Sequence, residues 1–242
     1  MSMKHLLFIS LALLLFSCGG KDKNDSGPSA ITTAEGDSTM YGLVCDGSND
    51  SVVIILPEDL SEPRSFSIIE AFRQHRVYGF PMTGDHVAIL PSEDGKSAKC
   101  LINIERLYGK WYRMVCPQWR KPVAMSDEHF ERMKNRILTQ LTDSARDSLL
   151  CPVEYLLELS ANGRVVCRGF HRNASEDDIH QLVEYPRAKH YSAWYLYNGL
   201  LLLSTQGQHP RTDTCTFRIV RNDTLIVSFP DGERKFYRKK QK

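Results

Sequence analysis

Short alternating segments separated by tight turns fill the second half of the chain, and they restrict it to few folds. Eight candidate strands can be counted there, at residues 110–115, 154–160, 164–169, 191–197, 200–205, 214–220, 224–229 and 233–238. Two of the connections contain Asn-Gly pairs, Asn162-Gly163 and Asn198-Gly199, which suit the left-handed residues of a type I′ turn. Such turns join neighbouring antiparallel strands, and eight strands close a small barrel. The pattern therefore predicts an eight-stranded up-and-down β-barrel.

Alternation along these segments separates the two faces of each predicted strand. Apolar side chains recur at every second position, at Tyr155, Leu157 and Leu159, at Cys215, Phe217 and Ile219, and at Leu225, Val227 and Phe229. Polar side chains such as Glu158, Arg218 and Ser228 take the alternate positions. We expect the apolar set to point into the barrel.

The first predicted strand of this barrel begins with Gly109-Lys110-Trp111. Gly-x-Trp at this place resembles the motif of lipocalins and of the lipocalin-like domains of Bacteroidota lipoproteins. The resemblance covers residues 108–242 and implies that the tryptophan closes one end of the barrel, with a basic side chain of the last strand across its ring. Arg234 and Arg238 are the candidates for that side chain, and Trp111 is expected to be structural.

A helical pattern interrupts the barrel between its first two strands. Residues 126–150 carry apolar side chains at spacings of three and four, at Phe130, Met133, Ile137, Leu141, Ala145 and Leu149. Ser126 is a good N-cap, and a second cap near Thr142 could begin a shorter helix. The polar face mixes both charges, which argues against binding to anionic lipid. We expect this insert to pack on the barrel or close its open end, with partner binding as the alternative.

The region before the barrel, residues 39–107, shows a second set of short β segments. Their sequences are MYGLVC, SVVIIL, SFSIIEAF, HVAIL and KCLINI, and turn signals separate them. Five strands in so short a region fit a small barrel or a curled sheet. The third segment has apolar residues on both faces, which indicates a strand covered on both sides. We predict a separate small β subdomain here.

The N-terminus has the pattern of an exported protein. Lys4 precedes an uncharged apolar run, residues 6–16, that is too short to span a bilayer as a helix. The sequence Leu15-Phe16-Ser17-Cys18 follows, and it resembles the lipobox of bacterial lipoproteins. The resemblance implies cleavage after residue 17, a diacylglycerol on the Cys18 thiol and a further acyl chain, which together would anchor the protein in a membrane. A plain secretory peptide with an incidental cysteine is the alternative.

The residues after Cys18 bear on location. Gly19 stands where retention at the inner membrane would call for aspartate, so the resemblance implies the outer membrane, with its periplasmic or surface face left open. The charged residues 21–25 resemble clusters that mark surface export in Bacteroidota. Residues 18–38 are rich in Gly, Ser and charge and have almost no large apolar side chain, which predicts a flexible tether.

The charge balance of the chain argues against nucleic acid as a partner. With 31 basic and 29 acidic residues, the chain gives no indication of nucleic-acid binding.

Of seven cysteines, lipidation of Cys18 leaves six in a compartment where disulfides persist. Cys116 and Cys151 flank the helical insert at neighbouring strand ends and are the best candidate pair. Isolated cysteines on apolar faces are nevertheless more often small core residues.

No catalytic motif stands out. Glu176, Asp177 and His180 lie at helical spacings, but polar loops show such clusters by chance, so we predict no metal and no cofactor. No nucleophile signature of the Gly-x-Ser-x-Gly or Cys-His kind is present in the sequence. A hydrolase site in residues 171–190, using His171, His180 and His190, is the alternative class of function.

Together these features favour a non-enzymatic, lipid-anchored protein of the cell envelope. Its barrel would bind a small or apolar ligand, or its surface would contact another envelope protein as an accessory module. The side chains expected to line a ligand site are Tyr155, Leu157, Trp194, Tyr195, Phe217 and Leu225. Trp194 and Tyr195 are neighbours in a strand and cannot both point inward. A solidly packed interior would leave only the interaction role.

Overall fold

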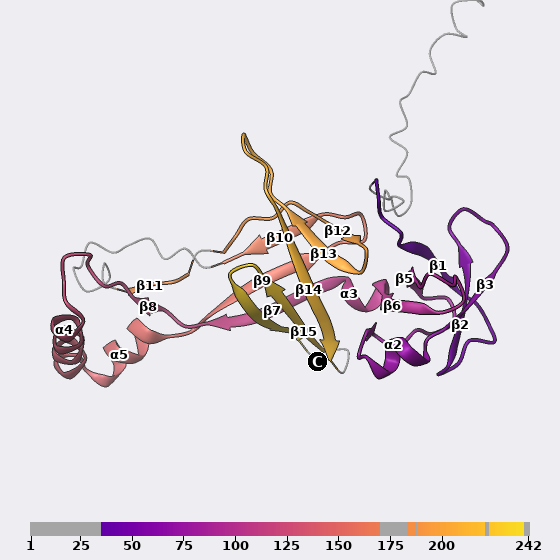
Figure 1. Cartoon of the computed structure of the whole chain (residues 1–242). Helices are drawn as coiled ribbons and strands as arrows, with labels where there is room; N and C mark the ends of the chain where they lie inside the picture. Colours follow the sequence, from indigo (N-terminus) through magenta and orange to yellow (C-terminus); the bar gives the residue numbers. More distant parts are fainter. Residues whose placement is uncertain (1–34, 170–182, 187, 221–222, 240–242) are drawn as a thin grey trace, which may run out of the picture.

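The computed structural model describes residues 35–169, 183–186, 188–220 and 223–239 (Figure 1). The described residues are mainly β, with 44% in strands and 16% in helices. A six-stranded sheet is formed by strands within residues 40–103, and an eight-stranded sheet by strands within residues 109–237. The fold class predicted from the sequence is confirmed, including the helical insert between the first two strands of the second sheet.

The eight-stranded sheet is the predicted meander. Its strands are β7 (Gly109–Val115), β9 (Val153–Leu159), β10 (Val165–Arg168), β12 (Ala193–Tyr197), β13 (Leu200–Ser204), β14 (Thr212–Val220), β15 (Thr224–Phe229) and β16 (Gly232–Tyr237). Strands adjacent in this order pair antiparallel, except that β10 and β12 form the two edges, and β16 also pairs with β7. A bridge between Arg164 and Ala193 links these edges, so the barrel is nearly closed.

The turn between β12 and β13 sets the register of that hairpin. Tyr197 pairs with Leu200, which leaves a two-residue turn of Asn198 and Gly199. Both have positive φ, 48° and 79°, a conformation that these two residue types adopt at low cost. The resulting register directs Leu196 and its neighbours on the same face into the barrel.

The six-stranded sheet forms the predicted small β subdomain, which was expected to be a small barrel or a curled sheet. Its strands are β1 (Met40–Val44), β2 (Val52–Pro57), β3 (Arg64–Ser67), β4 (Val77–Tyr78), β5 (His86–Pro91) and β6 (Ala98–Asn103), in the spatial order β3-β2-β1-β5-β6-β4. A parallel bridge between Ser67 and Ser97 brings β3 back beside the start of β6. All five predicted segments contribute a strand, and the two-residue β4 is additional.

One predicted strand ends earlier than its sequence indicates. The segment SFSIIEAF was predicted as a single strand, but β3 stops at Ser67 and the helix α2 (Ile69–Arg73) follows. The turn buries Ile68 and Ala71, three residues apart, and leaves Phe72 exposed. A helix of one turn shows too little periodicity to be distinguished from a strand with apolar residues on both faces.

One hydrophobic cluster spans the two β units, and a second cluster lies within the N-terminal sheet alone. The short helix α3 (Ile104–Leu107) joins β6 to β7, and Ile102 and Ile104 belong to the same buried cluster as the barrel interior. The rings of Tyr78 and Phe217 lie 5.0 Å apart between the two sheets. The N-terminal subdomain is therefore packed against the larger barrel and not only tethered to it.

The end of the predicted tether is also held in place. The Oδ1 atom of Asn198 accepts a hydrogen bond from the backbone N–H of Ser38 at 2.9 Å, and Asn198 donates its own N–H to Asp37 Oδ1 at 2.9 Å. The Asn198 side chain further donates to the carbonyl oxygen of Gly36. Residues 36–38, predicted as part of a flexible tether, are thus docked on the β12–β13 turn. Cys18 and residues 19–34 lie outside the described residues.

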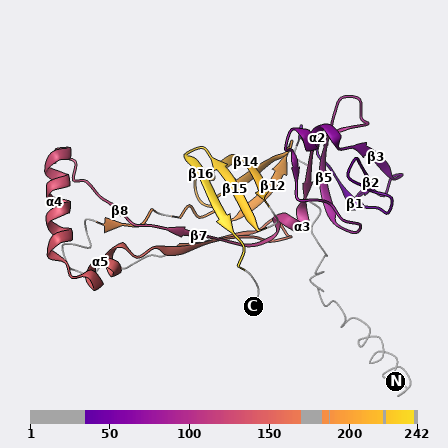
Figure 2. The ribbon, with the colours of Figure 1, turned by 90° about the horizontal axis from the view of Figure 1, so that it is seen from below.

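The helical insert forms two helices, as predicted, but it lies away from the barrel. The helices α4 (Asp127–Gln140) and α5 (Asp143–Leu150) begin at the predicted caps, where Ser126 and Thr142 accept backbone N–H bonds. They lie at the far end of an arm that continues from β7 and β9, along which β8 (Gln118–Trp119) pairs with β11 (Val183–Glu184) (Figures 1 and 2). The prediction that the insert packs on the barrel or closes it is wrong, because these paired strands carry the chain outward. We call residues 116–152 and 183–186 the arm.

Candidate functional site

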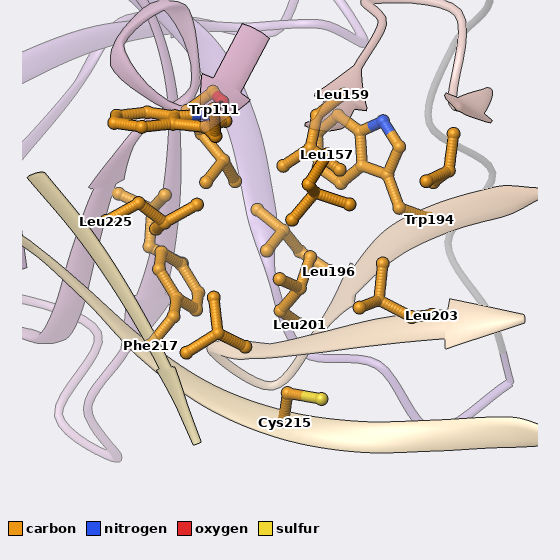
Figure 3. Close-up of a cluster of buried hydrophobic side chains, with 14 of the residues drawn as sticks. Trp111, Leu157, Leu159, Trp194, Leu196, Leu201, Leu203, Cys215, Phe217 and Leu225 are labelled. Carbon is orange, nitrogen blue, oxygen red and sulfur yellow. Dashed lines mark hydrogen bonds between the residues drawn. The ribbon is translucent and has the colours of Figure 1, made fainter. Parts of the chain in front are cut away.

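Trp111 lies in the cluster of buried hydrophobic side chains inside the barrel (Figure 3). Its side chain is 0% exposed, and its Nε1 donates a hydrogen bond to the carbonyl oxygen of Leu107 at 2.9 Å. The guanidinium carbon of Arg238 lies 4.3 Å from the centre of the tryptophan ring, close enough for a cation–π interaction. Arg238 also donates to the carbonyl oxygens of Arg106 and Tyr108, which fixes the guanidinium over the ring.

Of the two basic residues proposed for this position, Arg238 occupies it. Arg234 lies four residues before Arg238. Its guanidinium carbon is 4.3 Å from the centre of the Phe229 ring, and it pairs with Asp231 at 2.8 Å. Both arginines therefore lie on the inner face of β16, at opposite ends of the barrel.

The half of the barrel next to Trp111 is filled by side chains (Figure 3). The residues with no accessible surface are Leu159, Leu201, Leu203, Cys215, Leu225 and Val227. A void large enough for water would leave part of an adjoining side chain accessible, so none of these six residues borders one. Among the described residues, this half of the barrel is a packed core.

Five of the six residues predicted to line a ligand site belong to that core or border it. Tyr155, Leu157, Trp194, Phe217 and Leu225 are all buried, with 0–6% of their surface exposed. Trp194 points inward and donates its Nε1 hydrogen to the carbonyl oxygen of Ser160, whereas Tyr195 takes the opposite face and is only partly buried. The structure brings Leu157, Trp194, Phe217 and Leu225 together in one buried cluster. It buries Tyr155 outside that cluster and leaves Tyr195 on the opposite face.

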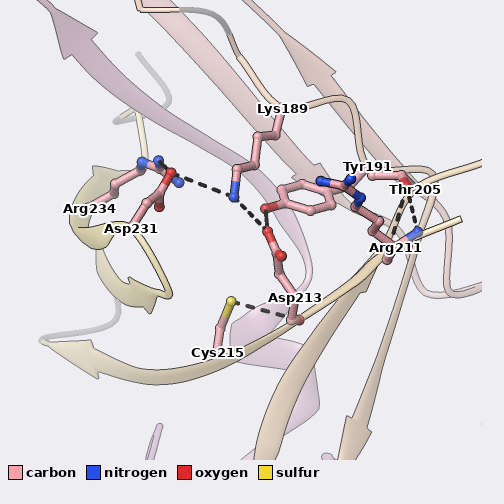
Figure 4. A network of polar contacts seen from close by, with 8 residues as sticks. All are labelled: Lys189, Tyr191, Thr205, Arg211, Asp213, Cys215, Asp231 and Arg234. Atoms are coloured by element: carbon pink, nitrogen blue, oxygen red, sulfur yellow. Dashed lines mark hydrogen bonds and ion pairs between the residues drawn. The ribbon is translucent and has the colours of Figure 1, made fainter. Parts of the chain in front are cut away.

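The opposite end of the barrel holds a polar network that the sequence did not predict (Figure 4). Asp213 accepts hydrogen bonds from the Lys189 ammonium at 2.8 Å and from the Tyr191 hydroxyl. Lys189 lies 3.5 Å from Asp231, which in turn pairs with Arg234. These residues come from the segment before β12, the start of β14, the β15–β16 turn and β16. The signal that could have revealed the network is Asp213 itself, a charged residue in phase with the inward-facing apolar positions of β14.

The network holds its groups in their ordinary charge states. Hydrogen bonds from Lys189 and Tyr191 lower the pKa of the Asp213 carboxyl, and the hydrogen bond to Asp213 raises the pKa of Lys189. Burial, reinforced by the hydrogen bond to Asp213, raises the pKa of the Tyr191 hydroxyl well above its usual range. Each shift moves the pKa of its group further from 7. None of the three groups is therefore tuned to exchange protons near neutral pH. The arrangement suits a fixed charged surface better than acid–base catalysis.

Acidification should weaken the fold through Asp213. A carboxyl whose pKa is lower in the folded state stabilises the fold above its unfolded-state pKa, and this stabilisation is lost as the pH falls through the folded-state value. We expect Asp213→Asn to lower Tm at neutral pH by about 2–4 °C, corresponding to about 1 kcal/mol for a chain of this size. Its Tm should then fall less steeply than that of the wild type below about pH 4.

Thermal denaturation followed by circular dichroism between neutral pH and pH 3 measures this difference. Asp147→Asn is the matched control, because Asp147 is an exposed carboxylate on α5. The control should reproduce the wild-type curve. Parallel curves for Asp213→Asn and the wild type would contradict the role assigned to the network.

The predicted hydrolase site falls mostly outside the described residues. His171, Glu176, Asp177 and His180 all lie there, and of the proposed residues only His190 is described, directly before Tyr191. In the described part of the chain, no three His, Cys, Asp or Glu side chains are grouped so that they could hold a metal ion.

The candidate disulfide is absent from the structure. Cys116 and Cys151 are both free and exposed. In the β7–β9 ladder Val115 pairs with Val153, so the next position along the ladder sets Cys116 opposite Pro152 and leaves Cys151 offset. The two strand ends are neighbours, as predicted, but the register does not bring the two cysteines directly opposite each other. Cys100 and Cys215 are buried core residues.

The arm carries apolar side chains that are incompletely covered. Of the residues in α4 and α5, the structure buries Phe130 and Leu149. The side chains of Met133, Ile137, Leu138 and Leu141, which we call the arm stripe, remain partly exposed within the described part of the chain. The helices lie far from the core that stabilises the barrel (Figure 2). The arm stripe is thus an apolar surface that the described residues cover only in part.

Over the described ranges, no helix has both the length and the apolar character needed to cross a membrane. No family model matches the chain, and neither a curated protein nor a solved structure is significantly similar to it.

Proposed function

We propose that this protein is a non-enzymatic accessory protein of the bacterial cell envelope. In this proposal, acyl chains on Cys18 hold it on the outer membrane, and the arm contacts another envelope protein. The lipobox-like sequence before Cys18 supports the anchor, and the resemblance of Gly109-Lys110-Trp111 to lipocalin-like lipoproteins supports the assignment to the envelope. The observation that carries the contact role is the partly exposed arm stripe at the far end of the arm.

The packing of the barrel favours contact over storage of an apolar ligand. The residues expected to line an apolar cavity are themselves buried against one another. A ligand would have to displace them, and opening a packed core costs several kcal/mol, about 24 cal/mol for each Å³ of cavity. The barrel is therefore better suited to support the arm than to enclose an apolar molecule.

The arm needs a partner for physical reasons. Helices shorter than about 12–15 residues are marginal in water, and most of their stability in proteins comes from packing an amphipathic face. α4 has 14 residues and α5 has 8, and the two bury few side chains between them. Coverage of the arm stripe by a partner would supply the missing burial, at about 25 cal/mol for each Å² of apolar surface.

Site-specific photo-crosslinking in living cells tests this role. A photoreactive amino acid in place of Ile137, in the arm stripe, should form a covalent adduct of one discrete mass with an envelope protein. The same amino acid in place of Asn135 is the control, because Asn135 is exposed on the opposite side of α4. We expect the Asn135 position to give at least tenfold less adduct. Equal labelling at the two positions, or no adduct at Ile137, would contradict the proposal.

A further inference from the structure

Arg113 points into the polar end of the barrel. It stands directly opposite Tyr155 in the β7–β9 ladder, and the pairing of Tyr112 with Tyr237 sets it beside Phe236 of β16. Its guanidinium carbon lies 5.8 Å from the centre of the Tyr155 ring and 6.0 Å from that of Phe236. Both rings are buried on the inner face of the barrel, so the charge of Arg113 lies on that face as well.

Among the residues that the structure describes, this guanidinium has no counter-ion. In the ranges that the structure describes, Arg113 makes no ion pair and no hydrogen bond, although a guanidinium carries five N–H donors. Burial, and then the nearby positive charge of Arg234, lower the pKa of Arg113, which shows how unfavourable the position is for a charge. The two rings lie within reach of a weak cation–π interaction, and the guanidinium nitrogens keep access to water, since none of them is among the buried atoms that lack a hydrogen bond.

The charges at this end of the barrel do not balance. The network of Lys189, Asp213, Asp231 and Arg234 has two positive and two negative groups, joined by the ion pairs described above. Arg113 adds a third positive group close to Arg234 and Asp231. One positive charge is therefore unmatched, and it is the one most enclosed by aromatic rings.

We propose that the polar end of the barrel binds an oxyanion, the carboxylate or phosphate group of a small molecule, with Arg113 as its main contact. The planar guanidinium fork matches either group through two parallel hydrogen bonds. Because the rings of Tyr155 and Phe236 are buried, the remainder of the ligand would extend away from them, toward solvent. This site is separate from the arm and the lipid anchor, so it stands or fails independently of the proposed function.

Anion binding by the purified full mature chain tests the site. Titration calorimetry and thermal denaturation would use sodium benzoate and sodium phosphate as probes, with sodium chloride of equal ionic strength as the reference. We expect at least one probe to bind with saturation and to raise Tm. Tighter binding of benzoate would assign a carboxylate on a flat apolar body, and tighter binding of phosphate would assign a phosphate group.

Two variants separate a binding role from a structural one. Arg113→Gln should weaken binding of the preferred probe at least tenfold, and its Tm without anions should equal or exceed that of the wild type because an unpaired charge has been removed. Arg113→Lys, which keeps the charge but loses the fork, should bind with intermediate affinity. Arg218→Gln is the matched control, since Arg218 lies exposed on the outer face of β14, and it should bind as the wild type does. Binding of neither probe, equal binding by Arg113→Gln, or a lower Tm of Arg113→Gln without anions would overturn the proposal.

Discussion

Replacement of Trp111 with alanine is expected to lower the free energy of unfolding by about 3–5 kcal/mol. The ring has no exposed surface, and its loss would remove a hydrogen bond to Leu107 and the surface that Arg238 covers. Since whole domains are stable by only about 5–15 kcal/mol, the variant should be close to unfolding at physiological temperature. Urea denaturation followed by circular dichroism measures the change.

A second tryptophan provides the control. Trp119 lies in β8 on the arm and is only partly buried, so Trp119→Ala should cost less than about 1 kcal/mol and leave the barrel intact. Arg238→Ala should fall between the two, at about 1–2 kcal/mol, for the lost cation–π contact and carbonyl hydrogen bonds. If Trp111→Ala and Trp119→Ala were equally stable, the barrel would not depend on the packing of Trp111.

Replacement of Cys18 with serine should release the protein from the membrane almost completely. The lipid-anchor proposal requires the thiol of residue 18, and each buried methylene of an acyl chain contributes about 0.8 kcal/mol to membrane binding. Without the thiol no chain is attached, so the protein should move from the membrane pellet to the soluble envelope fraction. Quantitative immunoblotting of the two fractions measures this redistribution.

Cys45→Ser is the matched control for that experiment. Cys45 is a free, partly buried cysteine next to β1, and its replacement should leave the protein in the membrane pellet. Persistence of Cys18→Ser in the pellet at the level of Cys45→Ser would contradict the lipid anchor.

The strands could be predicted from the sequence because their signals are local. Alternation, tight turns and Asn-Gly pairs such as Asn198-Gly199 place each strand of the larger barrel within about two residues of its observed ends. The helix caps at Ser126 and Thr142 are equally local and were predicted correctly. The helix α2 was missed because a single turn carries almost no periodicity.

Features that depend on distant contacts could not be predicted in the same way. The amphipathic pattern of α4 shows that one face needs covering but not what covers it, so the arm was wrongly placed on the barrel. Asp213 finds its partners, Lys189 and Tyr191, in a segment more than 20 residues earlier in the chain, and only the closed barrel brings them together. Arg113 is an intermediate case, because its position two residues after Trp111 already assigns it to the inner face.

In the proposed function, this molecule is anchored at one end and acts by contact through the arm. Native mass spectrometry of the protein, extracted in mild detergent from the membranes of its own cells, tests both parts at once. We predict a chain that begins at Cys18 and carries the mass of its acyl chains, in complex with a second envelope protein that is lost when Ile137 is replaced by aspartate. A chain without acyl groups, found alone in the wild type as in the variant, would contradict the account.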